Sequence, residues 1–127
     1  MQTLISNIAQ EDYLGFWSQP GEQPNYRAIT DFLQIDKEET AKIARVATSS
    51  VRYDRKIPQE LADRLEEIAN IANRVAALFD GDVQKTALWF RTPNPMLGDV
   101  SPRDMLRMNR YKRLAKFVTE AEQGRRG

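Results

Sequence analysis

The chain offers few side chains that could perform chemistry, because its 127 residues include neither cysteine nor histidine. Thiol nucleophiles, serine–histidine triads, disulfide bonds and the common zinc sites are therefore excluded. Asp99 and Asp104 could in principle exchange protons with a substrate, but no glycine-rich loop that would hold a phosphate accompanies them. We therefore expect a protein that binds a partner, with no catalytic residue, no metal and no cofactor.

The charges are distributed unevenly along the chain. Residues 1–80 carry nine Lys and Arg against thirteen Asp and Glu, a net charge of −4, and residues 81–127 carry ten against five, a net charge of +5. A basic C-terminal third is typical of proteins that bind nucleic acid or an acidic partner, and solvated helix faces would give the same balance. Charge alone leaves these three interpretations open.

The N-terminal residues predict neither a membrane span nor a signal peptide. Residues 1–10 form the longest stretch without a charge, but they are too few and too polar to cross a bilayer, and they lack the basic start of a signal peptide. We therefore expect a cytoplasmic protein without a membrane partner.

Residues 1–24 are predicted to form an irregular leader, because their apolar residues have no sustained period. A short helix over residues 1–10 is compatible with the pattern. The aromatic residues Tyr13, Phe16 and Trp17 are expected to pack onto the body of the protein or onto a second subunit, since apolar patches are rarely left in water.

From residue 25 onward the spacing of apolar residues predicts an all-α fold. The predicted helices cover residues 26–34, 37–44, 49–54, 58–79, 83–91, 102–108 and 110–123. Their expected N-caps are Asn25, Asp36, Thr48, Asp82 and Ser101, all residue types that accept a hydrogen bond from the first turn.

The helix over residues 58–79 has the clearest period. Its apolar residues repeat at intervals of three and four, which places them in one stripe: Leu61, Leu65, Ile68, Ala72, Val75 and Phe79. This pattern predicts a central core helix. Ile71 and Leu78 lie off the main stripe, so a role of the same helix as a dimer seam is the alternative.

Residues 25–57 have the internal pattern of a helix-turn-helix. With Lys37 as the first position, Ala41, Val46 and Val51 occupy the fifth, tenth and fifteenth positions, which such a module buries where its helices cross. The ninth position, usually Gly, is Arg45. A structural helical module that does not contact DNA is the alternative.

The exposed residues around the predicted second helix carry hydroxyl groups and positive charges, which suit contacts with phosphates and base edges. Residues 37–56 hold six basic and three acidic residues. The candidate DNA-binding residues are Lys42, Thr48, Ser49, Ser50, Arg52, Tyr53, Arg55 and Lys56.

The segments ALWFRTPNPMLG (residues 87–98) and SPRDML (residues 101–106) are more specific than generic helix and turn. They resemble the C-terminal toxin-binding domain of the Xre/MbcA/ParS-type antitoxins, which pair with RES-domain toxins. The chain departs from the family pattern in two places. It has Gly98-Asp99 where the family often has two glycines, and Arg103-Asp104 where the family often has a Leu-rich helix start. The resemblance extends over roughly residues 26–123, and the matching residues are Trp89, Pro93, Asn94, Leu97, Gly98, Pro102, Met105 and Leu106.

The resemblance implies an antitoxin that neutralises a RES-domain toxin, an NAD-consuming enzyme similar to ADP-ribosyltransferases. It also implies repression of the shared operon by a homodimer, because one short recognition helix reads few bases. The expected organisation is a leader (1–24), a helix-turn-helix module (25–57), and a long helix with the toxin-binding domain (58–127). A standalone helix-turn-helix regulator without a toxin is the alternative.

Toxin contacts are expected from residues 92–100, which Pro93 and Pro95 should hold in one shape, and from the basic residues that follow. Trp89 is expected to fill the core beneath this segment. Residues 120–127 are predicted to form a flexible basic tail that reaches the toxin's cleft or remains solvated. The candidate toxin-binding residues are Arg91, Asn94, Pro95, Met96, Leu97, Arg103, Arg107, Arg110, Tyr111, Lys112, Arg113, Arg125 and Arg126.

Overall fold

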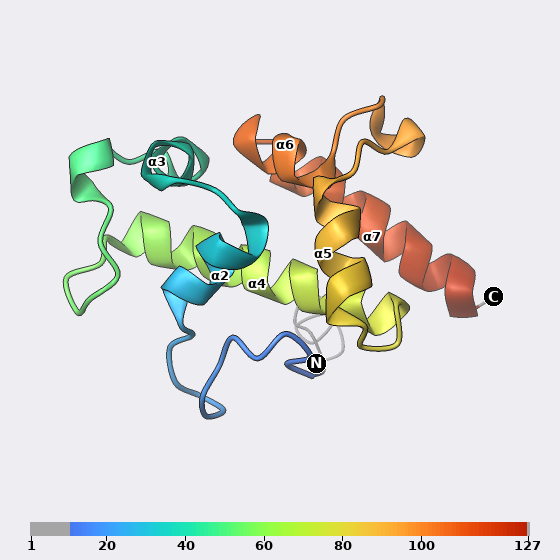
Figure 1. Ribbon diagram of the computed structural model, residues 1–127, viewed down its shortest axis with the longest axis horizontal. Coiled ribbons are helices and arrows are strands. Elements are labelled where there is room, and N and C mark those ends of the chain that lie inside the picture. The colour runs from blue at the N-terminus through green and yellow to red at the C-terminus, as the bar shows by residue number, and fades with distance from the viewer. Residues whose placement is uncertain (1–10, 127) are drawn as a thin grey trace.

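A computed structural model of the chain describes residues 11–126. Within these residues the regular structure is helical and includes no strand, so the predicted all-α fold is confirmed (Figure 1). The elements are α2 (Tyr26–Leu33), α3 (Lys37–Ala44), the 3-10 turn η1 (Thr48–Ser50), α4 (Gln59–Leu78), α5 (Val83–Arg91), the 3-10 turn η2 (Pro95–Leu97), α6 (Pro102–Arg107) and α7 (Tyr111–Arg126).

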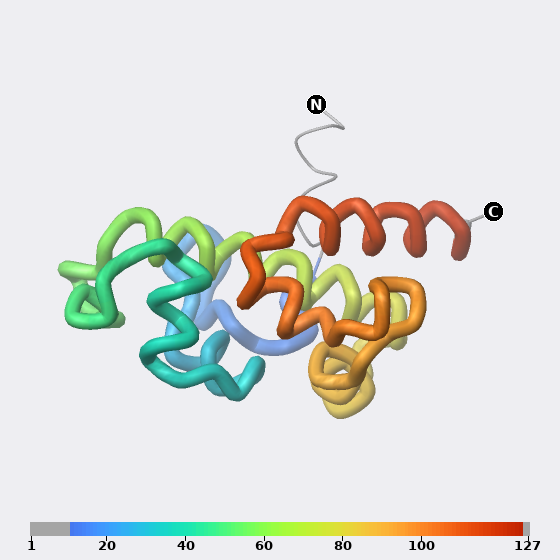
Figure 2. The backbone as a smooth tube through the Cα atoms, turned by 90° about the horizontal axis from the view of Figure 1, so that it is seen from above, coloured from blue at the N-terminus to red at the C-terminus, as the bar shows by residue number. Residues whose placement is uncertain are grey.

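Helix α4 is the centre of the structure. The helices α2, α3, α5 and α7 all pack against it, and α7 lies along it in the view from above (Figure 2). Its apolar stripe is buried, with Leu61, Leu65 and Ile68 at 0% exposure, which confirms the predicted core helix. Ile71 is also buried, so it is not available on the outside of this chain as a dimer seam. Neither α4 nor any other helix of the described part is long and apolar enough to cross a membrane.

Local side chains start the helices where the sequence predicts. The Asn25 side chain accepts a hydrogen bond from the Ala28 N–H, and Asp36 and Glu39 form a reciprocal capping box at the start of α3. Asp82 and Ser101 accept the corresponding bonds at α5 and α6. These caps satisfy N–H groups that have no partner inside the helix.

The described part of the leader packs onto the helices. Asn73 of α4, 1% exposed, accepts a hydrogen bond from the Leu14 N–H at 2.9 Å and donates one to Asp12 Oδ1 at 2.9 Å. Phe16 is buried and meets the Phe32 ring of α2 edge-on at 5.8 Å. The prediction that the aromatic residues of the leader pack onto the body is confirmed for Phe16. The helix considered for residues 1–10 lies outside the described residues.

The predicted helix over residues 49–54 is wrong. Only the single turn η1 forms, Thr48 makes no capping hydrogen bond, and Val51 is extended with φ −73° and ψ 113°. The cause is local, because Asp54 accepts a hydrogen bond from the Lys56 N–H at 2.9 Å and another from Arg52 Nε at 2.7 Å. Such bonds between an Asp side chain and a nearby backbone N–H compete with helix formation.

The predicted end of the last helix at residue 123 is also wrong, because α7 continues to Arg126. Arg74 of α4, 6% exposed, donates hydrogen bonds to Glu122 at 2.6 Å and to Thr119 at 2.9 Å. Arg125 donates to the carbonyl oxygens of Ala77 and Leu78 at the end of α4. These contacts hold the last turns of α7 against α4, so the residues up to Arg125 do not form the separate tail that was predicted.

Candidate functional site

Residues 92–100, which we call the bend, form a closed loop between α5 and α6. The Asn94 N–H donates to the Val100 carbonyl at 3.1 Å, and the Asp99 N–H donates to the Asn94 carbonyl at 3.0 Å. The Asn94 side chain accepts from the Met96 N–H at 2.9 Å. Gly98 and Asp99 both have positive φ, at 77° and 64°. The backbone of the bend is therefore fixed by its own hydrogen bonds.

Aromatic packing fixes the end of α5, from which the bend begins. Phe90 is fully buried, and Trp89 is half-buried and stacks on Phe117 of α7 with ring centres 6.3 Å apart. Leu97 is 4% exposed and belongs to the core, so the structure does not bring this candidate toxin contact to the surface. Trp89 packs against the core, as expected, although part of its ring remains exposed.

The outer side of α5 and the bend carries exposed apolar side chains. Leu88 is 62% exposed and Met96 is 75% exposed, and Pro93 and Pro95 are exposed between them in the sequence. The sequence analysis singled out Met96 but missed Leu88. The helical period could have found it, because Leu88 precedes the buried Phe90 by two positions and so points to the opposite side of the helix.

Two candidate residues on α6 are engaged within the chain. Arg103 Nη1 donates to the Leu33 carbonyl at 3.2 Å, and Arg107 forms ion pairs with Glu39 of α3 and with Asp104. These contacts hold α6 against the ends of α2 and α3. Arg103 and Arg107 are thus structural in the chain by itself, and the sequence could not show this because Leu33 and Glu39 lie far from them along it.

The remaining toxin-binding candidates lie apart from the bend. Tyr111 is half-buried, and the Arg64 guanidinium lies 5.2 Å from the centre of the Tyr111 ring. Burial together with the nearby Glu67 carboxylate raises the pKa of Tyr111. Arg110, Lys112 and Arg113 are exposed at the start of α7. Arg125 binds the end of α4, and the side chain of Arg126 lies outside the described part. The structure therefore groups only Arg91, Asn94, Pro95 and Met96 at the bend.

The candidate DNA-binding residues follow η1 and the loop to α4. Arg52 and Asp54 form an exposed ion pair, which raises the pKa of Arg52 and lowers that of Asp54. Tyr53 lies below the Arg27 guanidinium at 5.1 Å. These side chains line an open groove of about 840 Å³ that carries both charge signs: Arg27, Lys37 and Arg52, and Asp31, Asp36 and Asp54.

The other DNA-binding candidates lie at the surface around this groove. Lys42 is exposed on α3, Thr48 and Ser49 are exposed on η1, and Ser50 is half-buried. Arg55 and Lys56 are exposed in the following turn. Hydroxyl groups and positive charges therefore remain accessible here, although no second helix presents them.

Comparison with known proteins identifies the part of the chain that contains the bend. Residues 74–109 match the family described as the antitoxin Xre/MbcA/ParS C-terminal toxin-binding domain. This match begins in α4, includes α5, the bend and α6, and ends before α7. No curated protein and no solved structure matches the chain. The family match supports an Xre/MbcA/ParS-type antitoxin whose toxin-binding domain includes residues 74–109.

Proposed function

We propose that this protein neutralises a RES-domain toxin, an NAD-consuming enzyme, by covering the toxin with the outer side of α5 and the bend. The observation that carries the proposal is the pair of exposed apolar side chains, Leu88 and Met96, within the matched toxin-binding domain. The resemblance of the sequence to antitoxins that pair with RES-domain toxins supports this class of toxin.

The geometry of the bend favours tight binding. Burying a Leu or Met side chain that is exposed in the free protein contributes roughly 1.5–3 kcal/mol. The hydrogen bonds of Asn94 and Asp99 hold the backbone before the partner arrives, which reduces the entropy lost on association. A few anchors of this kind carry most of the binding energy in many interfaces.

Replacing Leu88 and Met96 together by Asp is expected to weaken binding to the toxin by about 100-fold or more, on the order of 3 kcal/mol. The measurements are rescue of growth during co-expression with the product of the neighbouring gene, and co-purification of the two proteins. Met108→Asp is the control, because Met108 is also an exposed apolar residue at 46% but follows the end of α6, outside α5 and the bend. Full rescue by the double variant would rule out this surface.

We propose operon repression by a homodimer as a second function. It is supported by the burial of Ala41 and Val51 at two of the helix-turn-helix positions, and by Arg45, which has a φ of 59° at the turn position usually occupied by Gly. Absence of a RES-type gene beside this one would instead favour the standalone regulator.

The variant Arg52→Ala combined with Arg55→Ala tests the DNA contact predicted from the sequence. We expect weaker operator binding. The slope of the logarithm of the binding constant against the logarithm of the salt concentration should also become shallower, by about 1 for each lost phosphate contact. A gel shift over a series of salt concentrations measures both. Unchanged binding would remove residues 48–56 from the DNA interface.

A further inference from the structure

Two segments of the chain contain basic residues and no acidic ones. Residues 40–53 include Lys42, Arg45 and Arg52, and residues 105–119 include Arg107, Arg110, Lys112, Arg113 and Lys116. The segments are more than fifty residues apart in the sequence. Lys42 and Arg52 are candidate DNA-binding residues, and Arg107, Arg110, Lys112 and Arg113 are candidate toxin-binding residues.

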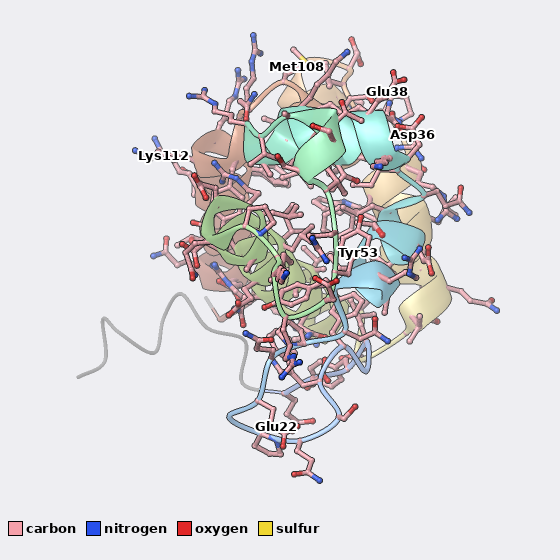
Figure 3. All side chains as sticks on the ribbon, turned by 90° about the vertical axis from the view of Figure 1, so that its left-hand side faces the viewer. Glu22, Asp36, Glu38, Tyr53, Met108 and Lys112 are labelled. Carbon is pink, nitrogen blue, oxygen red and sulfur yellow. The ribbon has the colours of Figure 1, made fainter. Side chains whose placement is uncertain are left out.

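The fold brings these two segments to one side of the molecule. Helix α6 packs against α3, and Arg107 at its end pairs with Glu39 in the first turn of α3. The end of α6 lies beside α3 in both the front view and the view from above (Figures 1 and 2). In the side view, Lys112 lies on the side of α3 opposite to Asp36 and Glu38 (Figure 3). The basic end of α3 and the start of α7 are therefore neighbours.

Most of these charges have no partner within the described chain. Arg52 and Arg107 form ion pairs, but no ion pair is found for the others among the described residues. Three acidic residues of the neighbouring elements are already engaged, since Glu39 and Asp104 pair with Arg107 and Glu67 pairs with Arg64. Lys116 is also exposed, one turn further along α7. We use the name corner surface for the five exposed residues at the end of α3 and the start of α7: Lys42, Arg45, Arg110, Lys112 and Arg113.

We propose that the corner surface binds the phosphate backbone of duplex nucleic acid without reading its sequence. Long, exposed and unpaired basic side chains neutralise phosphates and release their counterions, which supplies most of the affinity of non-specific binding. A protein interface usually has buried aromatic or apolar anchors at its centre, and the corner surface has only charged side chains. Lys42 and Arg45 belong to the proposed helix-turn-helix module, so this part of the inference rests on the proposed repressor function. Arg110, Lys112 and Arg113 lie outside both the bend and residues 48–56, so their contribution can be tested separately.

Lys112→Gln combined with Arg113→Gln tests the proposal on the full chain. We expect the logarithmic salt slope for a random-sequence duplex of about 20 base pairs to fall by about 2, with about a 10-fold loss of affinity or more. Fluorescence anisotropy over a series of salt concentrations measures both quantities. The control is Lys85→Gln, which removes a positive charge from the exposed surface of α5, outside the bend and the corner surface, and should leave the slope unchanged.

Arg45→Gly separates binding from folding. Gly adopts the φ of 59° at this position without strain, so thermal stability should be maintained or raised while the affinity for the duplex falls severalfold. Polyglutamate is the competing probe for an acidic protein partner. Binding to polyglutamate but not to the duplex, or equal slopes for the Lys112/Arg113 variant and its control, would overturn the proposal. If only the Arg52/Arg55 variant lost DNA binding, the repressor function would stand and the corner surface would not.

Discussion

The substitution Phe90→Ala is expected to lower the free energy of unfolding by about 3–5 kcal/mol, the cost of removing a large aromatic side chain from a packed core. Phe90 has 0% exposure and meets the Phe32 ring of α2 at 5.8 Å and the Trp89 ring at 5.1 Å. It is the middle ring of a series that continues through Phe32 to Phe16 and through Trp89 to Phe117. The cavity left by the substitution would therefore weaken contacts of α2 and α5 together.

Thermal unfolding followed by circular dichroism measures this effect, and we expect a decrease in Tm of roughly 10–20 °C. Leu88→Ala is the control on the same helix, because Leu88 is 62% exposed and should change stability by less than about 0.5 kcal/mol. Phe90→Leu keeps most of the volume and should cost clearly less than the Ala variant. Equal Tm values for Phe90→Ala and Leu88→Ala would contradict the described packing.

Glu122→Ala is expected to cost about 2–4 kcal/mol, because it leaves the buried guanidinium of Arg74 without its carboxylate. Arg74 is 6% exposed and Glu122 is 24% exposed, so the pair is only weakly screened by water. Thr119 Oγ1 would remain as an acceptor at 2.9 Å, which keeps the cost below that of a fully isolated charge.

Chemical denaturation measures this loss, and the matched control is Glu120→Ala on the same helix. Glu120 is exposed, and no ion pair is found for it among the described residues, so its removal should be nearly neutral. Identical unfolding midpoints for the two variants would show that Arg74 does not depend on Glu122. A large loss from Glu122→Ala alone would confirm that this pair holds α7 against α4.

The helices and the bend were predictable because their signals are local. Asp36 and Glu39 form their capping box within one turn, and Asn94 closes its own turn with a side-chain hydrogen bond. Pro58 and Pro102 stand beside the starts of α4 and α6, where a missing N–H costs nothing. Such signals do not depend on the rest of the fold.

The errors have equally definite causes. The helix over residues 49–54 does not form because the Asp54 side chain bonds to the Lys56 N–H, which the apolar spacing does not reveal. The structural role of Arg107 depends on Glu39, a residue sixty-eight positions earlier in the chain. Which apolar residues of the toxin-binding domain face outward was also misjudged in part, since Leu97 is buried and Leu88 is exposed. The role of Arg107 and the burial of Leu97 depend on packing between distant segments, whereas the Asp54 contact is local but is made by a polar side chain.

The attachment of α7 to α4 bears on how long the protein persists in a cell. A protease cleaves a folded protein at segments that open locally. Arg74 and Arg125 bind the last turns of α7, so opening these turns requires breaking contacts that also stabilise the core. Degradation from this side would then follow the equilibrium population of opened molecules. A bound toxin that stabilises the state with α7 attached to α4 would therefore slow the degradation of this protein.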